Sequence, residues 1–332
     1  MSSEAYRQIT TLLPSLSSEE QERLQKWLRT NPSISLADLV QIKENQGIAC
    51  PDCGGIKHLV KFGKTKDGVQ RYHCKKCKST FTPLSYTFLS NSKKDLSVWL
   101  SYIDCMIDGM TIRKAAKYCG ISVMTAFMWR HKILDILRNK LKCIKLKDVI
   151  EADDTYVRES YKGNQPPNRE SYKRGTSASK PGISEEQIAV STAIDRNGKV
   201  YGKISARGRS TAKEISRAIG ARISRDSVLC TDNDAAYKKF AREKHLEHVV
   251  IQEHETVKGV YHINTINAYH SRLKAFIKKF KGVATKYLDN YLAWLNSMGE
   301  RKLNLRQVVK AAIKEDWIGT WQAITNKPLM PV

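Results

Sequence analysis

Acidic residues are scarce in this sequence, and long apolar runs are absent. The 332 residues carry 33 Asp and Glu against 57 Lys and Arg, a formal net charge of +24. This excess favours a polyanionic partner, because neutralising phosphates drives binding to nucleic acid. A basic ribosomal or membrane-surface protein is the alternative. A helix that crosses a bilayer needs about 20 consecutive apolar residues, so no transmembrane segment and no membrane partner are expected.

The first residues also lack the features of a secretory signal. They show no basic start followed by an apolar block, so we expect an intracellular protein, cytoplasmic and associated with the nucleoid. Disulfides are rare in that compartment, so the eight cysteines are not expected to pair as disulfides. A chain of this length, with 41% hydrophobic residues, can form two or three domains with at least one sizeable core.

Four of the cysteines form two pairs with C-x-x-C spacing. Cys50 and Cys53 make the first pair, and Cys74 and Cys77 make the second. Each pair can present two thiolates from a tight turn, and two pairs complete a tetrahedral four-sulfur zinc site. The segment between them has the pattern of two short strands around a Lys-Asp-Gly turn. We therefore predict a zinc ribbon over residues 47–92, with redox-active cysteine pairs as the alternative.

Helical periodicity follows over residues 93–145. Thr111 and Ser122 can each cap a helix, and Gly120 between them suits a turn. This layout predicts a helix-turn-helix, whose second helix can enter the major groove of DNA. A plain three-helix bundle with a solvated basic face is the alternative. The predicted DNA contacts on the second helix are Arg130, His131 and Lys132.

Acidic residues then appear inside an apolar run with the composition of a strand. The run Val149–Val157 contains three of them, although an unpaired buried carboxylate costs several kcal/mol. A second short strand, Val228–Cys230, ends just before Asp232. If the two strands lie side by side, Asp153 and Asp232 face each other. Paired carboxylates with water and phosphate are the ligands that Mg²⁺ prefers, so the pattern predicts a metal site.

The order of the later elements favours a mixed sheet covered by helices and fits the ribonuclease-H-like fold. The order is strand, hairpin pair, helix, strand, helix, strand, helix, with a basic loop at 158–185 after the first strand. The expected fold class is therefore α+β with several domains. The predicted segments are 1–46 (helical N-terminal segment), 47–92 (zinc ribbon), 93–145 (helix-turn-helix domain), 146–298 (ribonuclease-H-like catalytic domain) and 299–332 (C-terminal helical tail).

Three segments carry a resemblance to a known family. The sequences EADDTYV, VLCTDND and HINTINAYHSRLKAFI follow the predicted zinc ribbon and helix-turn-helix. In this combination they resemble bacterial insertion-sequence transposases of the IS1595-like group, whose catalytic signature is Asp, Asp, Asn, Lys. The resemblance covers about residues 48–298. It implies a ribonuclease-H-like domain that uses Mg²⁺ or Mn²⁺ to cleave and join DNA.

The resemblance also implies which residues act. Asp153 and Asp232 match the two aspartates, and Asn267 stands where most relatives of the wider class carry Glu. An amide oxygen can ligate Mg²⁺ but is neutral, so it weakens the second metal site. Asn267 is therefore either the normal ligand of the group or the mark of an inactive copy. Lys274, two helical turns further on, would contact a phosphate as a point charge.

Four neighbouring side chains have weaker assignments. Glu151 shares the alternation phase of Asp153 and either supports the metal ligands or is a surface carboxylate. Asp154 points to the opposite face of a regular strand and is not expected to be a ligand. Asp234 is expected to cap the next helix. His270 could approach the site, but a place on a polar helix face is the favoured interpretation.

These features predict a metal-dependent DNA transposase. It would bind the terminal inverted repeats of its element, hydrolyse a phosphodiester, and use the freed 3′-hydroxyl to attack target DNA. Zinc would be structural, and Mg²⁺ or Mn²⁺ catalytic. Holding two DNA ends together implies a homodimer or a larger assembly. The alternatives are a DNA-binding regulator with an inactive transposase-like domain and a structure-specific nuclease.

Overall fold

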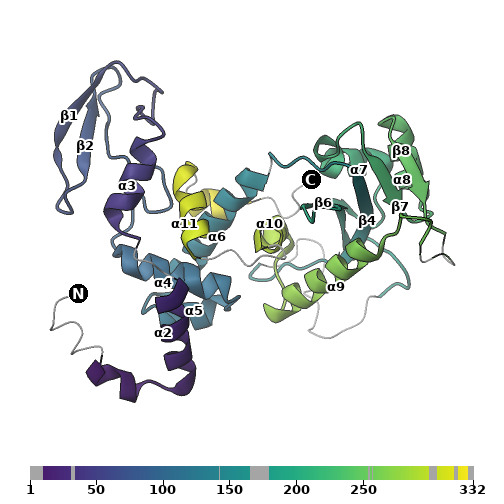
Figure 1. Ribbon diagram of the computed structural model, residues 1–332, viewed down its shortest axis with the longest axis horizontal. Helices are drawn as coiled ribbons and strands as arrows, with labels where there is room; N and C mark the ends of the chain where they lie inside the picture. The colour runs from purple at the N-terminus through teal and green to yellow at the C-terminus, as the bar shows by residue number, and fades with distance from the viewer. Residues whose placement is uncertain are drawn as a thin grey trace. The chain divides into compact units, whose positions relative to one another are not determined.

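A computed structural model gives the fold of two compact units, residues 1–107 with 304–314 and residues 108–303 with 315–332 (Figure 1). The described residues are 10–30, 34–141, 143–164, 179–252, 255, 257–298, 305–317 and 321–327. None of the helices in these ranges combines the length and apolar character that a bilayer span requires. The boundary between the units falls inside the segment 93–145, so each unit is described by itself.

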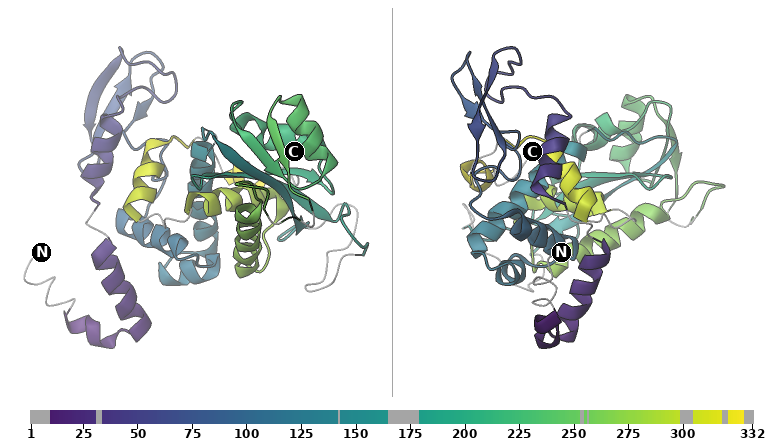
Figure 2. Two further views of the ribbon diagram at one scale, coloured as in Figure 1. Left: turned by 45° about the vertical axis from the view of Figure 1, so that its right-hand side comes forward. Right: turned by 60° about the vertical axis from the view of Figure 1, so that its left-hand side comes forward.

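The first unit contains helices and one small sheet (Figure 2). Its helices are η1 (Leu13–Ser15, a 3₁₀ turn), α2 (Ser18–Thr30), α3 (Leu36–Glu44), α4 (Leu96–Ile107) and α11 (Leu305–Lys314). Helix α11 packs against both α3 and α4. Its buried face carries Leu305, Val308 and Ile313, which follow the helical period of three to four residues. Residues distant in sequence therefore share one core.

The small sheet is an antiparallel ladder in the order β1-β2-β3. Its strands are β1 (Leu59–Lys64), β2 (Gln70–Cys74) and β3 (Thr80–Phe81). Gly68 lies in the turn between β1 and β2 with φ +78°, a conformation that costs glycine little and other residues more. Cys50, Cys74 and Phe81 form the buried cluster of this sheet. The predicted hairpin between the two cysteine pairs is thus present.

The second unit is built on a five-stranded mixed sheet in the order β6-β5-β4-β7-β8. Its strands are β4 (Val149–Arg158), β5 (Gln187–Asp195), β6 (Val200–Arg207), β7 (Val228–Thr231) and β8 (Glu247–Val250). Strand β4 pairs antiparallel with β5 and parallel with β7, and β7 pairs parallel with β8. The predicted mixed α+β sheet is confirmed. Of the predicted basic loop 158–185, residues 165–178 lie outside the described ranges.

Helices cover both faces of this sheet (Figures 1 and 2). Helices α7 (Ala212–Ile219) and α8 (Ala235–Glu243) pack with Ile150 on one face. Helices α9 (Asn264–Lys279) and α10 (Leu288–Met298) pack on the other face, where Leu273 is fully buried. Side chains alternate between the two faces of a strand, so successive residues of β4 point toward different helix layers.

The remaining helices of this unit are α5 (Ile112–Tyr118), α6 (Val123–Leu141), α12 (Trp321–Thr325) and the 3₁₀ turns η2 (Gly220–Arg222) and η3 (Thr285–Tyr287). The Thr111 hydroxyl accepts the Lys114 N–H at the start of α5, and the Ser122 hydroxyl accepts the Thr125 N–H at the start of α6. Gly120 turns the chain between them with φ +60°. Both predicted caps and the predicted turn are therefore present, and α6 packs against α5 and α10.

Candidate functional site

An acidic pocket of about 930 Å³ lies where β7 and β8 end beside β4. The parallel register pairs Glu151 with Cys230. Continuing that register by two residues sets Asp153 beside Asp232. Both aspartates line the pocket, and so does Asn267 from the first turns of α9. The structure thus brings three of the four predicted catalytic residues to one cavity.

The fourth predicted residue lies apart from this cavity. Lys274 is two turns further along α9, on the same side of the helix as Asn267, and its side chain is exposed. It is not among the residues that line the acidic pocket. Any contact with DNA that Lys274 makes would therefore lie beside the pocket and not inside it.

Glu151 joins β4 to the start of α9. Its carboxylate is 1% exposed and accepts the backbone N–H of Ile266 at 3.0 Å. The first amides of a helix have no partner within the helix, and the residue before α9, Ile263, makes no side-chain cap. Glu151 supplies that cap from a different element. It also pairs with Arg196, so the alternative of a surface carboxylate is excluded.

Asp154 points to the opposite face of β4 and contacts α8. Its carboxylate accepts a hydrogen bond from the Tyr237 hydroxyl at 2.7 Å. Burial raises the pKa of Asp154, and the Tyr237 bond opposes that rise. Asp234 accepts the Ala236 N–H at the start of α8, so its predicted role as a helix cap is confirmed.

The acids of the pocket repel one another. Burial raises the pKa of Asp232, and the neighbouring charges of Asp153, Asp234 and Asp154 raise it further. The neighbouring carboxylates therefore disfavour the charged form of Asp232. A bound divalent cation would reverse this repulsion, and carboxylate and amide oxygens are the donors that Mg²⁺ or Mn²⁺ prefers.

His270 is closer to the site than the sequence indicated. It is buried, with Nδ1 3.5 Å from an Asp153 carboxylate oxygen. Its Nε2 has no hydrogen-bond partner among the described residues. The favoured interpretation, a polar helix face, is wrong. The available signal was its position three residues after Asn267, which places both side chains on neighbouring parts of α9.

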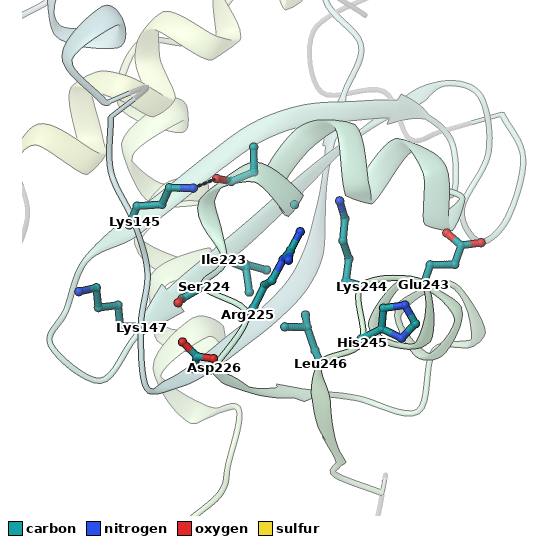
Figure 3. A pocket seen from close by; sticks show the side chains of 12 residues that line it. Lys145, Lys147, Ile223, Ser224, Arg225, Asp226, Glu243, Lys244, His245 and Leu246 are labelled. Atoms are coloured by element: carbon teal, nitrogen blue, oxygen red, sulfur yellow. Dashed lines mark hydrogen bonds between the residues drawn. The ribbon is translucent and has the colours of Figure 1, made fainter.

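A second hollow, of about 790 Å³, lies at the other end of the sheet (Figure 3). Its lining comes from the segments that precede β4, β7 and β8, including Lys147 and Arg225. Two acids, Asp226 and Glu243, stand on different sides of it. Lys145 also lines it and donates to the Ala221 carbonyl at 2.7 Å. Without paired carboxylates this basic hollow suits an anion, so the acidic pocket is the better candidate for a divalent cation.

The predicted DNA contacts on α6 are buried. The Arg130 guanidinium donates to the Met110 carbonyl at 2.7 Å and lies 5.0 Å from the Trp294 ring centroid. The ring centroids of His131 and Tyr287 are 4.2 Å apart. The Lys132 Nζ atom lies 4.5 Å from the ring centroid of Trp317. The exposed fractions of the predicted contacts are 0% for Arg130, 1% for His131 and 7% for Lys132. The assignment of these three side chains to DNA is wrong, because aromatic partners enclose them.

The four predicted zinc ligands converge in the first unit. The sulfur atoms of Cys50, Cys53, Cys74 and Cys77 all lie within 4.8 Å of one another. Burial raises the pKa of the Cys50 thiol, but hydrogen bonds with the Ser79 hydroxyl and the local backbone outweigh it and lower the pKa to about 6. Among the described residues this is the one such group of three or more His, Cys, Asp or Glu. No three acids of the pocket lie this close together among the described residues.

The match to a known protein family falls within the second unit. Residues 145–298 match the model of the ISXO2-like transposase domain. The matched segment, named the transposase domain after that model, includes the whole five-stranded sheet with Asp153, Asp232 and Asn267.

Similar chains extend beyond the transposase domain. An uncharacterized protein in the transposable element ISH50 of Halobacterium salinarum is 26% identical over 258 residues, which cover 76% of this chain and 86% of that protein. A chain of the simian T-cell lymphotropic virus intasome, in complex with the PP2A regulatory subunit B56 gamma, is 12% identical, with 66% of this chain and 76% of that chain covered and a TM-score of 0.30. A chain of the Mos1 strand transfer complex is also 12% identical, with 68% and 80% covered and a TM-score of 0.22. At TM-scores this low, neither structure defines the fold of this chain.

We expect Glu151→Gln to destabilise the transposase domain by about 1–3 kcal/mol, because an amide replaces a buried, charged acceptor. Urea denaturation measures the loss, and the Ile266 amide should exchange its hydrogen faster. Glu247→Gln on β8 is the matched control, since its side chain is exposed. Unchanged exchange at Ile266 would contradict the proposed cap.

Asp232→Asn should stabilise the protein in metal-free buffer at neutral pH. Because the folded-state pKa of Asp232 is raised, the stability contributed by its protonated form is lost as the pH rises through that pKa. The uncharged amide avoids this loss, and a gain of ~1 kcal/mol raises the thermal midpoint by about 2–4 °C.

The advantage should shrink as the pH falls toward the range where Asp232 protonates. Asp226→Asn, at an exposed acid of the basic hollow, should leave the midpoint unchanged. A lower midpoint for Asp232→Asn would show that this carboxylate stabilises the metal-free fold.

Proposed function

We propose that this protein is a DNA transposase that cleaves the ends of its element and joins them to target DNA in a metal-dependent reaction. One observation supports this most strongly: Asp153, Asp232 and Asn267 line a single acidic pocket of the transposase domain. The strand order, with one antiparallel hairpin pair and two parallel strands beside β4, supports a ribonuclease-H-like fold.

The residues in and beside the pocket have different roles in this proposal. Asp153 and Asp232 hold Mg²⁺ or Mn²⁺ through their carboxylates, and Asn267 adds a neutral amide oxygen. Bound divalent cations supply Lewis acidity to the oxygens of a phosphodiester. Glu151 keeps α9 against β4 and so keeps Asn267 beside the aspartates. Lys274, exposed on the same side of α9, contacts a phosphate of the bound DNA.

The reaction consists of two displacements at phosphorus. In the first, water attacks a phosphodiester at the end of the element, the 3′-oxygen leaves, and a 3′-hydroxyl and a 5′-phosphate result. In the second, that 3′-hydroxyl attacks a phosphodiester of target DNA, and a new 3′-hydroxyl leaves. The number of phosphodiester bonds is unchanged in the second step, so no external energy source is needed.

In this proposal the segments that precede the catalytic segment bind the DNA substrate. The four-cysteine site holds structural zinc in a zinc ribbon at residues 47–92, and residues 93–145 include a helix-turn-helix. Both bind the terminal inverted repeats, ahead of the catalytic segment 146–298. The described helices of residues 1–46 and 299–332 serve as flanks of these segments. Two ends must be held together, so the active form is a homodimer or a larger assembly on DNA, at the nucleoid.

Asp153→Ala should lower Mg²⁺-dependent cleavage by more than about 100-fold, because even outer partners of metal ligands cost about 10–100-fold when lost. The substrates are DNA duplexes that carry the sequences bracketing the reading frame, and labelled products are separated by size. Asp226→Ala removes an exposed acid of the basic hollow and should cleave like the wild type.

Each alternative predicts a different result in this assay. A structure-specific nuclease would cleave without joining strands and without preferring the terminal sequences. A DNA-binding regulator would show no cleavage, with the wild type and Asp153→Ala alike. If Asn267 marks an inactive copy, the wild type would fail and Asn267→Glu would gain activity.

Cys77→Ser should abolish zinc binding and lower DNA affinity, since one missing thiolate opens the tetrahedral site. We expect about one zinc per chain in the wild type, measured by mass spectrometry of the purified protein. Cys143→Ser is the control, because Cys143 is exposed and outside the four-cysteine group. Wild-type zinc content in Cys77→Ser would refute the assignment.

A further inference from the structure

Large apolar side chains are exposed at the junction of α5 and α6. Tyr118 is 51% exposed, Val123 50% and Met124 59%. These three lie within seven residues of sequence, at the end of one helix and the start of the next. A cluster of exposed apolar groups on a polar surface is typical of an interaction site.

The N-terminus of α6 has features that favour contact with a negatively charged molecule. The Ser122 side chain caps the helix by accepting the Thr125 N–H at 3.0 Å. The backbone N–H groups of Val123 and Met124 begin the helix, where the macrodipole favours negative charge. The N-terminus of α6 therefore combines an attraction for anions with an exposed apolar surface.

The charged residues in the segment that carries this surface, residues 109–134, are all basic. The sequence contains no Asp or Glu between Asp108 and Asp135. Arg113, Lys114 and Lys117 on α5 are all exposed. Arg113 and Lys117 are four residues apart and so lie on one face of the helix. The combination of exposed basic and apolar side chains on this segment is complementary to DNA and not to a basic protein surface.

We propose that Val123 and Met124 read DNA sequence by contacting thymine 5-methyl groups in the major groove, while Arg113 and Lys117 bind the flanking phosphates. This rests on the proposed function, in which α5 and α6 belong to a DNA-binding helix-turn-helix. In that motif the N-terminal residues of the second helix contact base edges. The thymine methyl group is the apolar feature of the major groove, and apolar side chains are its partners.

The same geometry explains why the later residues of α6 do not read bases. Arg130 lies about two turns further along and is fully buried against Phe280 and Trp294. The central part of α6 forms the core of its unit, packed on α5 and α10. Of the described residues of α6, the exposed ones are Val123 and Met124 in the first turn and Asn139 near the end, so it is the start of the helix that can present apolar side chains to DNA.

The test is selection from a pool of randomised DNA duplexes by the full-length protein, followed by sequencing of the bound fraction. Wild type should enrich a motif that contains a T·A pair. Val123→Ala or Met124→Ala should relax the preference at one such position. Replacing that thymine by deoxyuridine removes only the methyl group, and should weaken wild-type binding about fourfold.

Whichever of Val123→Ala and Met124→Ala relaxes the preference at that position should bind the thymine duplex and the deoxyuridine duplex equally well. Val260→Ala, at another exposed valine of the same unit, is the control and should keep the wild-type motif. Lys117→Ala should weaken binding to all sequences equally and make it less salt-dependent, whereas Lys213→Ala on α7 should not.

The outcomes separate this inference from the proposed function. If wild type selects a motif but Val123→Ala and Met124→Ala select it equally well, with the same response to deoxyuridine, the base-reading role is overturned and the transposase proposal stands. If wild type selects no motif at all, sequence-specific binding of element ends fails, and the base-reading role fails with it.

Discussion

The buried carboxylate of Glu151 is the interaction on which the site depends. It lies on β4, accepts the Ile266 N–H in the first turn of α9, and pairs with Arg196 from the β5–β6 turn. Without these partners a carboxylate in this position would be costly, and without the carboxylate α9 would begin with an uncapped amide. One side chain thus fixes the helix that carries Asn267 against the strand that carries Asp153.

The acids of the pocket carry an electrostatic cost in the folded protein. Burial disfavours the charged form of Asp232, and the neighbouring charge of Asp153 adds to that cost. This local concentration of acids contrasts with the chain as a whole, whose formal net charge is +24. Under the proposed function, positive charge elsewhere on the protein favours binding of DNA, and the negative charge of the pocket favours binding of divalent cations. The two requirements are met because the acids are gathered at one end of the sheet.

Several elements could be predicted because their signals are local. Cys50, Cys53, Cys74 and Cys77 are close in sequence, and the turn glycines stand where the chain must reverse. The positions of Asp153 and Asp232 followed from strand order together with the family resemblance. The prediction that Arg130, His131 and Lys132 of α6 contact DNA was wrong, because these side chains are buried. Basic residues usually indicate a solvated face, but Arg130 is enclosed by Trp294 and Phe280 from helices far along the chain.

The sequence by itself determined the elements, the cysteine cluster and the candidate acids, because periodicity, turn residues and C-x-x-C spacing act over a few residues. Only the tertiary structure decided that Glu151 caps α9 and that His270 approaches Asp153. Those contacts join residues more than a hundred positions apart. Their geometry depends on how the sheet and its helices pack, and no local pattern encodes that packing.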